Sequence, residues 1–134
     1  MKKIIASVLF LMIFLSGCSI SENNNKGEAS ENNKYKTISQ EEAKRIMDEE
    51  EGYLILDVRT EEEYKEGHIP NAINIPNEII SENTTTILND KEQIILVYCR
   101  SGRRSKEASE KLIKLGYNNI YDFGGLNTWK YDIE

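Results

Sequence analysis

The chain has few of the side chains that build metal centres and cross-links. Its 134 residues include two cysteines, Cys18 and Cys99, and one histidine, His68. A Cys/His metal site would therefore have too few ligands, so we expect no metal. If Cys18 is consumed by the modification considered below, Cys99 is the only thiol and no intramolecular disulfide can form.

Positive charge is also scarce. The chain has 17 basic and 23 acidic side chains, a formal net charge of −6, and Lys2 and Lys3 lie at its extreme N-terminus. An acidic protein repels polyanions, so we expect no nucleic-acid partner and no electrostatic adsorption to a membrane. The segment from Arg100 to Lys106 is a local basic exception.

The apolar run at the N-terminus is too short to cross a bilayer comfortably. It extends from Ile4 to Leu15, whereas a spanning helix needs roughly 20 residues. Two lysines precede it and the small residues Ser16 and Gly17 follow it, which is the pattern of a secretory signal. A retained transmembrane helix is the weaker interpretation.

The residues at the end of that run, Leu15-Ser16-Gly17-Cys18, resemble the lipobox of bacterial lipoproteins. The resemblance implies that residues 1–17 are a signal peptide and that the Cys18 sulfur receives a diacylglyceryl group. Two or three acyl chains, such as palmitate, would anchor the protein stably. We therefore expect an extracytoplasmic protein that is lipid-anchored to a bacterial cell membrane. The alternative is a plain secretory signal in which Cys18 is incidental.

A polar segment separates this leader from a domain-sized remainder. Residues 18–34 contain almost no apolar side chain after Cys18 and repeat Asn, Glu and Ser. Such a segment cannot bury a core, so we expect a linker. Residues 35–134 have the length of one compact domain.

Within this domain, apolar runs alternate with amphipathic segments. We expect strands at 35–38, 53–56, 72–75, 94–98 and 117–122. Helices should begin near Ser39, Thr60 and Ser105, with one or two helical turns in 76–88 and another turn reaching Trp129. Ser39 with Glu42, and Thr60 with Glu63, have the spacing of capping boxes. Strands alternating with helices predict a three-layer α/β domain with a mainly parallel central sheet.

Cys99 ends the most apolar of these strands and is the main candidate for chemistry. Between it and the expected helix lie Arg100, Ser101, Gly102, Arg103 and Arg104. We expect the backbone N–H groups of this loop to converge on the Cys99 sulfur, where they, the helix N-terminus and the arginines favour a thiolate and bind anions. Cys99 could instead be an ordinary core residue, although three arginines beside it would be costly to bury.

Asp57 ends a neighbouring strand. Because ligands bind at the carboxyl ends of parallel strands, we expect Asp57 and Cys99 to lie at the same edge of the sheet. Asp57 could accept hydrogen bonds from the Cys99 loop or cap a turn. We expect Arg59 and Glu63 to form a structural ion pair, and His68 to have a structural role rather than that of a catalytic base.

Three ordered motifs carry a resemblance to the rhodanese-like domain. The segment Leu56–Pro76, LDVRTEEEYKEGHIPNAINIP, resembles its signature, CRSGRRS from Cys99 to Ser105 resembles its active-site loop, and Gly124, Gly125 and Trp129 match its closing GG…W pattern. Asn71 stands where the family often has Gly, and Asn tolerates a positive φ.

The resemblance implies a single-domain sulfurtransferase. Cys99 would take sulfane sulfur from a small anionic donor such as thiosulfate, and cyanide or a thiol would remove it from the resulting persulfide. Arg100, Ser101, Gly102, Arg103, Arg104 and Ser105 would bind the donor, and Asp57 and Arg59 would support them. No organic cofactor is needed, and we expect a monomer.

Two other functions remain open. Phosphatases and arsenate reductases of the same fold have a loop of Cys, five residues and Arg, whereas four residues separate Cys99 from Arg104. The smaller loop suits a sulfur atom better than a tetrahedral phosphate. A non-enzymatic rhodanese-like binding module is the second alternative, although such modules usually lack the cysteine.

Overall fold

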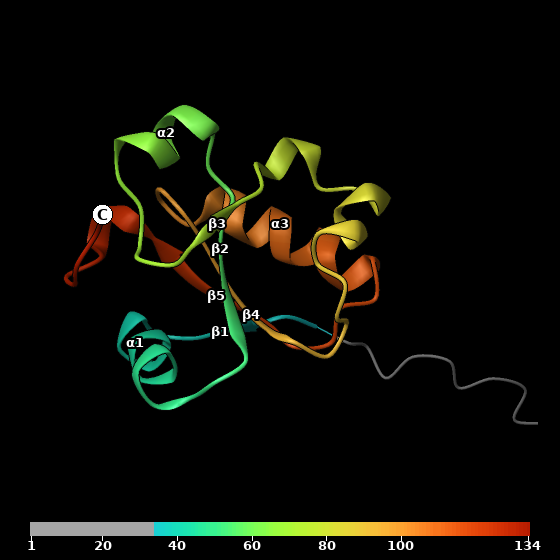
Figure 1. Cartoon of the computed structure of the whole chain (residues 1–134), viewed down its shortest axis with the longest axis horizontal. Coiled ribbons are helices and arrows are strands. Elements are labelled where there is room, and N and C mark those ends of the chain that lie inside the picture. The colour runs from blue at the N-terminus through green and yellow to red at the C-terminus, as the bar shows by residue number, and fades with distance from the viewer. Residues whose placement is uncertain (1–33) are drawn as a thin grey trace, which may run out of the picture.

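The computed structural model describes residues 34–134, which form a central sheet flanked by helices (Figure 1). The leader, Cys18 and the linker up to Asn33 lie outside the described residues. The five strands are β1 Lys36–Thr37, β2 Tyr53–Asp57, β3 Ile73–Asn74, β4 Ile94–Cys99 and β5 Ile120–Gly125. They are parallel and lie in the order β1-β5-β4-β2-β3. The predicted α/β class is confirmed.

Residues 34–134 also form three α-helices and three short 3-10 helices, of which the last in the chain follows β5 and the others connect strands. They are α1 Gln40–Glu49, α2 Glu61–Glu66, α3 Arg103–Lys114, η1 Asn77–Ile79, η2 Glu82–Thr86 and η3 Leu126–Thr128. Thr60 and Glu63 form the predicted capping box of α2. Ser39 caps α1, but the Glu42 carboxylate binds Arg45 instead of returning to the cap. The predicted Ser39–Glu42 box is therefore only half formed.

Strands β1 to β4 differ from the sequence prediction by one residue at one or both ends, and α3 and β5 differ by more. Helix α3 begins at Arg103 rather than Ser105, so Arg103 and Arg104 are already helical. Strand β5 begins at Ile120, later than predicted, and continues through Gly125. The connection after Cys99 is consequently shorter, and Gly124 and Gly125 belong to the sheet.

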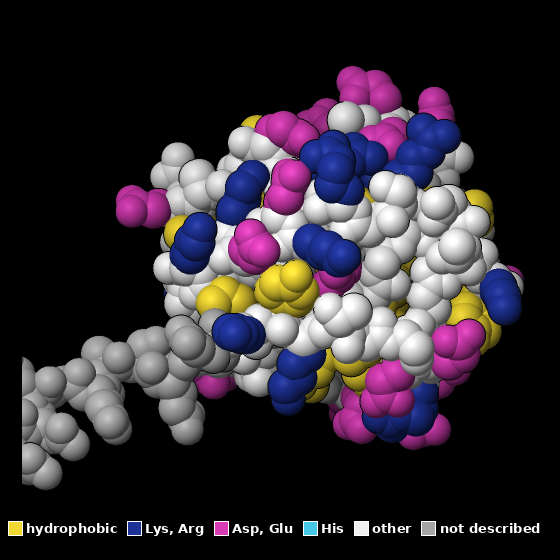
Figure 2. Space-filling view, turned by 180° about the vertical axis from the view of Figure 1, so that it is seen from behind, with side chains coloured by type: hydrophobic (Ala, Val, Ile, Leu, Met, Phe, Trp, Pro, Cys, Tyr) yellow, Lys and Arg dark blue, Asp and Glu magenta, His cyan; other side chains and the backbone are white. Residues whose placement is uncertain are grey.

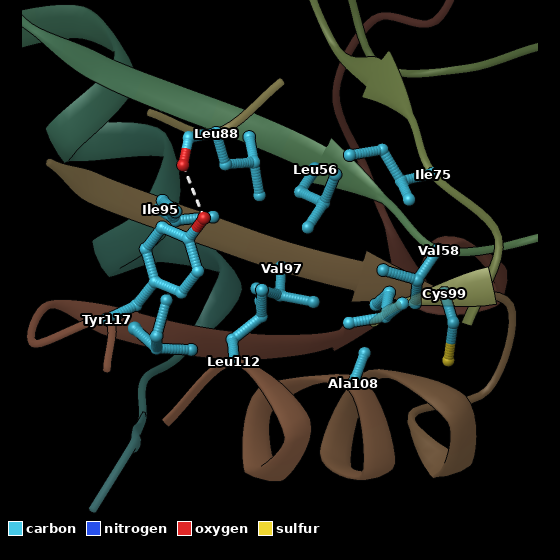
Figure 3. Packing of buried hydrophobic residues seen from close by; sticks show 12 residues of the cluster. Leu56, Val58, Ile75, Leu88, Ile95, Val97, Cys99, Ala108, Leu112 and Tyr117 are labelled. Carbon is cyan, nitrogen blue, oxygen red and sulfur yellow. Dashed lines mark hydrogen bonds between the residues drawn. The ribbon is translucent and has the colours of Figure 1, made fainter. Parts of the chain in front are cut away.

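Alternation along β4 divides the buried side chains into two cores. Ile95, Val97 and Cys99 face the side covered by α3, where Ala108 and Leu112 pack on them (Figure 3). Leu96 and Tyr98 face the side covered by α1. Successive side chains of a strand point to opposite faces, so a sheet buried on both faces needs the unbroken apolar run found here.

Within residues 34–134, no helix combines the length and hydropathy that crossing a membrane requires.

Asn71, in the turn before β3, adopts φ 67°, a positive value that Asn tolerates. His68 in the same turn stacks on the Tyr64 ring, with 3.8 Å between ring centroids. Its position thus fits the structural role expected for it.

Candidate active site

Cys99 lies at the carboxyl end of β4, where the strand meets the first turn of α3. Its side chain is fully buried, and Figure 3 shows its sulfur directed toward that turn. The Gly102 N–H donates a hydrogen bond to Cys99 Sγ at 3.0 Å. In the part of the chain that the structure describes, it is the single backbone donor bonded to this sulfur. A donor and a helix N-terminus both favour negative charge on the sulfur.

The loop that covers Cys99 is held in a tight turn. Gly102 has φ 101°, a left-handed conformation that favours glycine, and it is the N-cap of α3. Ser105 is buried, and its Oγ donates to the Gly102 carbonyl at 3.0 Å. Ser105 therefore shapes the loop, while Arg100 and Ser101 are exposed.

Gly125 lies directly beneath this loop. A Cβ at Gly125 would come within 2.2 Å of the Arg100 carbonyl oxygen and 2.7 Å of the Ser101 Cα, so no larger residue fits without a shift of backbone. The Asn127 N–H donates to the same Arg100 carbonyl at 3.1 Å. Two residues of the GG…W segment, Gly125 and Asn127, thus contact the Cys99 loop and hold it in place.

Glu63 forms its ion pair with Arg104. The predicted ion pair between Arg59 and Glu63 is therefore wrong. Two guanidinium nitrogens of Arg104 bind the Glu63 carboxylate at 2.7 and 2.9 Å, and both side chains are largely buried. This contact lowers the pKa of Glu63 to about 2 and, with a smaller contribution from Cys99, raises the pKa of Arg104. The pair ties α2 to the first turn of α3 beside the sulfur.

Arg59 instead pairs with Asp57. Its guanidinium binds the fully buried Asp57 carboxylate at 2.6 Å and the Gly67 carbonyl at 2.7 Å. The Tyr98 hydroxyl donates to Asp57 at 2.7 Å, and burial followed by the charge of Asp57 raises the pKa of Tyr98, which keeps this hydroxyl protonated.

Asp57 therefore lies at the same edge of the sheet as Cys99 but on the opposite face. It pairs in register with Tyr98, whose side chain belongs to the α1 core, whereas Cys99 belongs to the α3 core. Its carboxylate binds the Arg59 backbone N–H, the Arg59 guanidinium and the Tyr98 hydroxyl. It thus caps the turn after β2, and within residues 34–134 no hydrogen bond joins it to the Cys99 loop.

The remaining basic residues of the site are exposed. Arg103 forms an ion pair with Glu107 one turn along α3, at 3.0 Å. Figure 2 shows that Lys and Arg side chains alternate with Asp and Glu on the face it displays. In residues 34–134, no group of three or more His, Cys, Asp or Glu could hold a metal ion.

Residues 39–132 match the family described as Rhodanese-like domain, so the chain belongs to the rhodanese-like family. It is 41% identical over 71 residues to the thiosulfate sulfurtransferase PspE of Escherichia coli, covering 53% of this chain and 68% of that protein. It is 35% identical over 80 residues to a sulfurtransferase of Allochromatium vinosum, covering 59% of this chain and 73% of that one. In longer relatives, such as the adenylyltransferase and sulfurtransferase uba4 of Ogataea parapolymorpha, the match covers 21% of their length.

Solved structures give the same result. A rhodanese-like domain protein of Staphylococcus aureus has a TM-score of 0.65 and 34% identity, covering 74% of this chain and 96% of its own. A structure described as rhodanese with anions from E. coli has a TM-score of 0.57 and 35% identity, covering 61% of this chain and 96% of its own. Together with the curated relatives, they support a rhodanese-type sulfurtransferase.

The close approach of Gly125 to the Arg100 backbone can be tested with Gly125→Ala. Its Cβ would force the Arg100 carbonyl away, so we expect sulfurtransferase turnover to fall by about tenfold or more and stability by about 1–3 kcal/mol. Gly52→Ala is the control, because Gly52 has φ 73° and open space around it, far from the site. It should lose about 1 kcal/mol and keep its turnover. Equal turnover in both variants would contradict the close approach.

The Arg104–Glu63 pair predicts a pH dependence of stability. Glu63→Gln keeps the helix cap but removes the charge. Because the pKa of Glu63 is lowered to about 2 in the folded state, the stabilisation is complete above its unfolded value near 4.5 and disappears as the pH falls toward 2. At pH 7 the free energy of unfolding of the wild type should exceed that of the variant by roughly 1 kcal/mol, and this margin should disappear in acid. Urea unfolding at several pH values measures it, with exposed Glu62→Gln as the control. A margin independent of pH would exclude the pair as its source.

Proposed function

We propose that the protein transfers sulfane sulfur from thiosulfate to a thiophilic acceptor, cyanide or a thiol, through a persulfide on Cys99. The observation that supports this most directly is the Gly102 N–H bonded to Cys99 Sγ at the N-terminus of α3. The chain's relatives named thiosulfate sulfurtransferase support the same reaction. The N–H group and the helix N-terminus stabilise a thiolate, and afterwards the negative charge of a persulfide.

In the first half-reaction, the Cys99 thiolate attacks the outer sulfur of thiosulfate. A bond forms between the two sulfurs, the S–S bond of thiosulfate breaks, and sulfite leaves with the electron pair. Arg100 on the covering turn and Arg103 at the start of α3 are exposed and suit the attraction of this dianion. Because Cys99 itself is fully buried, the turn of residues 100–102 has to shift to admit the donor.

Phosphatase chemistry is the weaker candidate. It needs an arginine whose guanidinium is free to bind the equatorial oxygens of phosphate. Arg104 has the sequence position closest to that role, but both of its contacting nitrogens bind Glu63. The site therefore favours a sulfur donor over a phosphate ester.

The activity test uses purified protein with two substrates. We expect thiosulfate:cyanide sulfurtransferase activity, its complete loss in Cys99→Ser, and negligible hydrolysis of an aryl phosphate. Cys99→Ser keeps a side chain of nearly the same size, so its unfolding midpoint serves as the folding control. Phosphate hydrolysis with no sulfur transfer would overturn the proposal, and the absence of both activities in folded wild type would favour a binding module.

We also propose that residues 1–17 are removed and that Cys18 is lipidated, so that the domain is held extracytoplasmically at a bacterial membrane by residues 18–34. The support is the sequence alone: Leu15-Ser16-Gly17-Cys18 after an apolar run, followed by a polar segment. In a bacterial host, the wild type should fractionate with membranes and carry an acyl mass, and Cys18→Ser should lack that mass. An unacylated wild type that fractionates as the variant does would contradict the anchor.

A further inference from the structure

A hollow of about 410 Å³ opens beside the Cys99 loop. Its walls are Arg59 after β2, Glu63 and Glu66 from α2, Arg100 from the loop, Leu126 and Asn127 from η3, and Ile133 near the C-terminus. Figure 1 shows why these walls meet: the C-terminal segment folds back to lie beside α2. Two backbone hydrogen bonds between His68 and Glu134, at 2.9 and 2.8 Å, hold it there. We call this space the acceptor hollow.

The acceptor hollow adjoins the loop that covers the reacting sulfur. Arg100 directly follows Cys99, and its carbonyl is fixed over Gly125 and by Asn127. Glu63 binds Arg104, the second residue of α3, and Cys99 Sγ accepts a hydrogen bond from Gly102, the N-cap of the same helix. A molecule in the hollow is therefore placed next to the turn that covers the sulfur.

Two of the four charged side chains that line the acceptor hollow already bind other groups of the protein. Arg59 binds Asp57 and the Gly67 carbonyl, and Glu63 binds Arg104. Arg100 and Glu66 are exposed and, among residues 34–134, neither forms an ion pair. The hollow thus offers one free cation and one free anion, and the apolar side chains of Leu126 and Ile133 also line it.

We propose that the physiological acceptor is a small thiol carrying both a carboxylate and an ammonium group, bound with the carboxylate at Arg100 and the ammonium at Glu66. This inference rests on the proposed sulfurtransferase function and names its acceptor class. The volume is that of a small-molecule site, far larger than cyanide requires. A carboxylate matches the planar guanidinium of Arg100, and a carboxylate such as Glu66 is the natural partner of an ammonium.

The transfer step balances without a further reactant. The acceptor thiol loses its proton to water, and its thiolate attacks the outer sulfur of the Cys99 persulfide. The S–S bond at Cys99 breaks, its electron pair returns to Cys99 Sγ, and the acceptor leaves as a persulfide. No second thiol exists among residues 34–134 to intercept the sulfur, so the acceptor hollow serves an external nucleophile.

The test compares four small thiols that carry different charged groups: cysteine, 3-mercaptopropionate, cysteamine and 2-mercaptoethanol. Thiosulfate is the donor for the full chain and its Glu66→Gln and Arg100→Gln variants. In a ping-pong reaction, kcat/KM for the acceptor reports the second half-reaction alone. The ratio of variant to wild type for each acceptor also cancels differences in intrinsic thiol reactivity.

Glu66→Gln should lower kcat/KM for cysteine and cysteamine about two- to fivefold more than for the two acceptors without an ammonium, which is the size expected of an exposed ion pair. Arg100→Gln should do the same for cysteine and 3-mercaptopropionate. Glu62→Gln, on the same helix but outside the hollow, should show no preference among the four. Ratios equal across the acceptors would overturn the inference while leaving sulfur transfer intact. If no acceptor supports turnover, the proposed function fails and the inference fails with it.

Discussion

The close approach of the Arg100–Ser101 backbone to Gly125 is the constraint on which the site depends. Only a residue without a Cβ leaves room for the chain to cross here, and the Arg100 carbonyl is then held by the Asn127 N–H. From that crossing, the left-handed Gly102 turns the chain into α3 and brings its own N–H to Cys99 Sγ. Gly125 therefore helps to set the position of the Gly102 N–H, which donates to the sulfur.

Successive side chains of a strand point to opposite faces of the sheet, and this explains why Cys99 and Asp57 lie on different faces. Cys99 has the same parity as Ile95 and Val97 and so faces α3, while Tyr98 faces α1 and binds Asp57. One face thus carries the thiol, and the other carries the buried Asp57–Arg59 pair that fixes the turn after β2. The Glu63–Arg104 pair joins the α2 segment back to the thiol side.

Much of this arrangement could be predicted from the sequence, because it depends on local signals. The apolar run before Cys99 predicted a doubly buried strand, and the spacing of Thr60 and Glu63 predicted the capping box that is observed. The α/β class followed from the alternation of such segments. The start of α3 was misplaced because Arg103 and Arg104 carry no apolar periodicity that could indicate a helix.

The errors at the site are tertiary in origin. Spacing along the chain suggested Arg59 as the partner of Glu63, whereas the true partner, Arg104, is 41 residues away in sequence. A sequence signal for the Asp57–Arg59 pair did exist, since residues two apart in an extended chain share a face. The acceptor hollow had none, because its walls come from α2, the Cys99 loop and the C-terminal segment.

The central claim is that Cys99 carries the transferred sulfur, and intact-mass spectrometry tests it most directly. The protein is treated with thiosulfate, freed of small molecules and weighed, then digested to locate any modification. The account predicts a mass gain of one sulfur atom on the peptide containing Cys99, which persists until cyanide or a thiol is added. An unchanged mass in protein that still turns over thiosulfate would contradict it, because the sulfur would then pass directly between bound substrates.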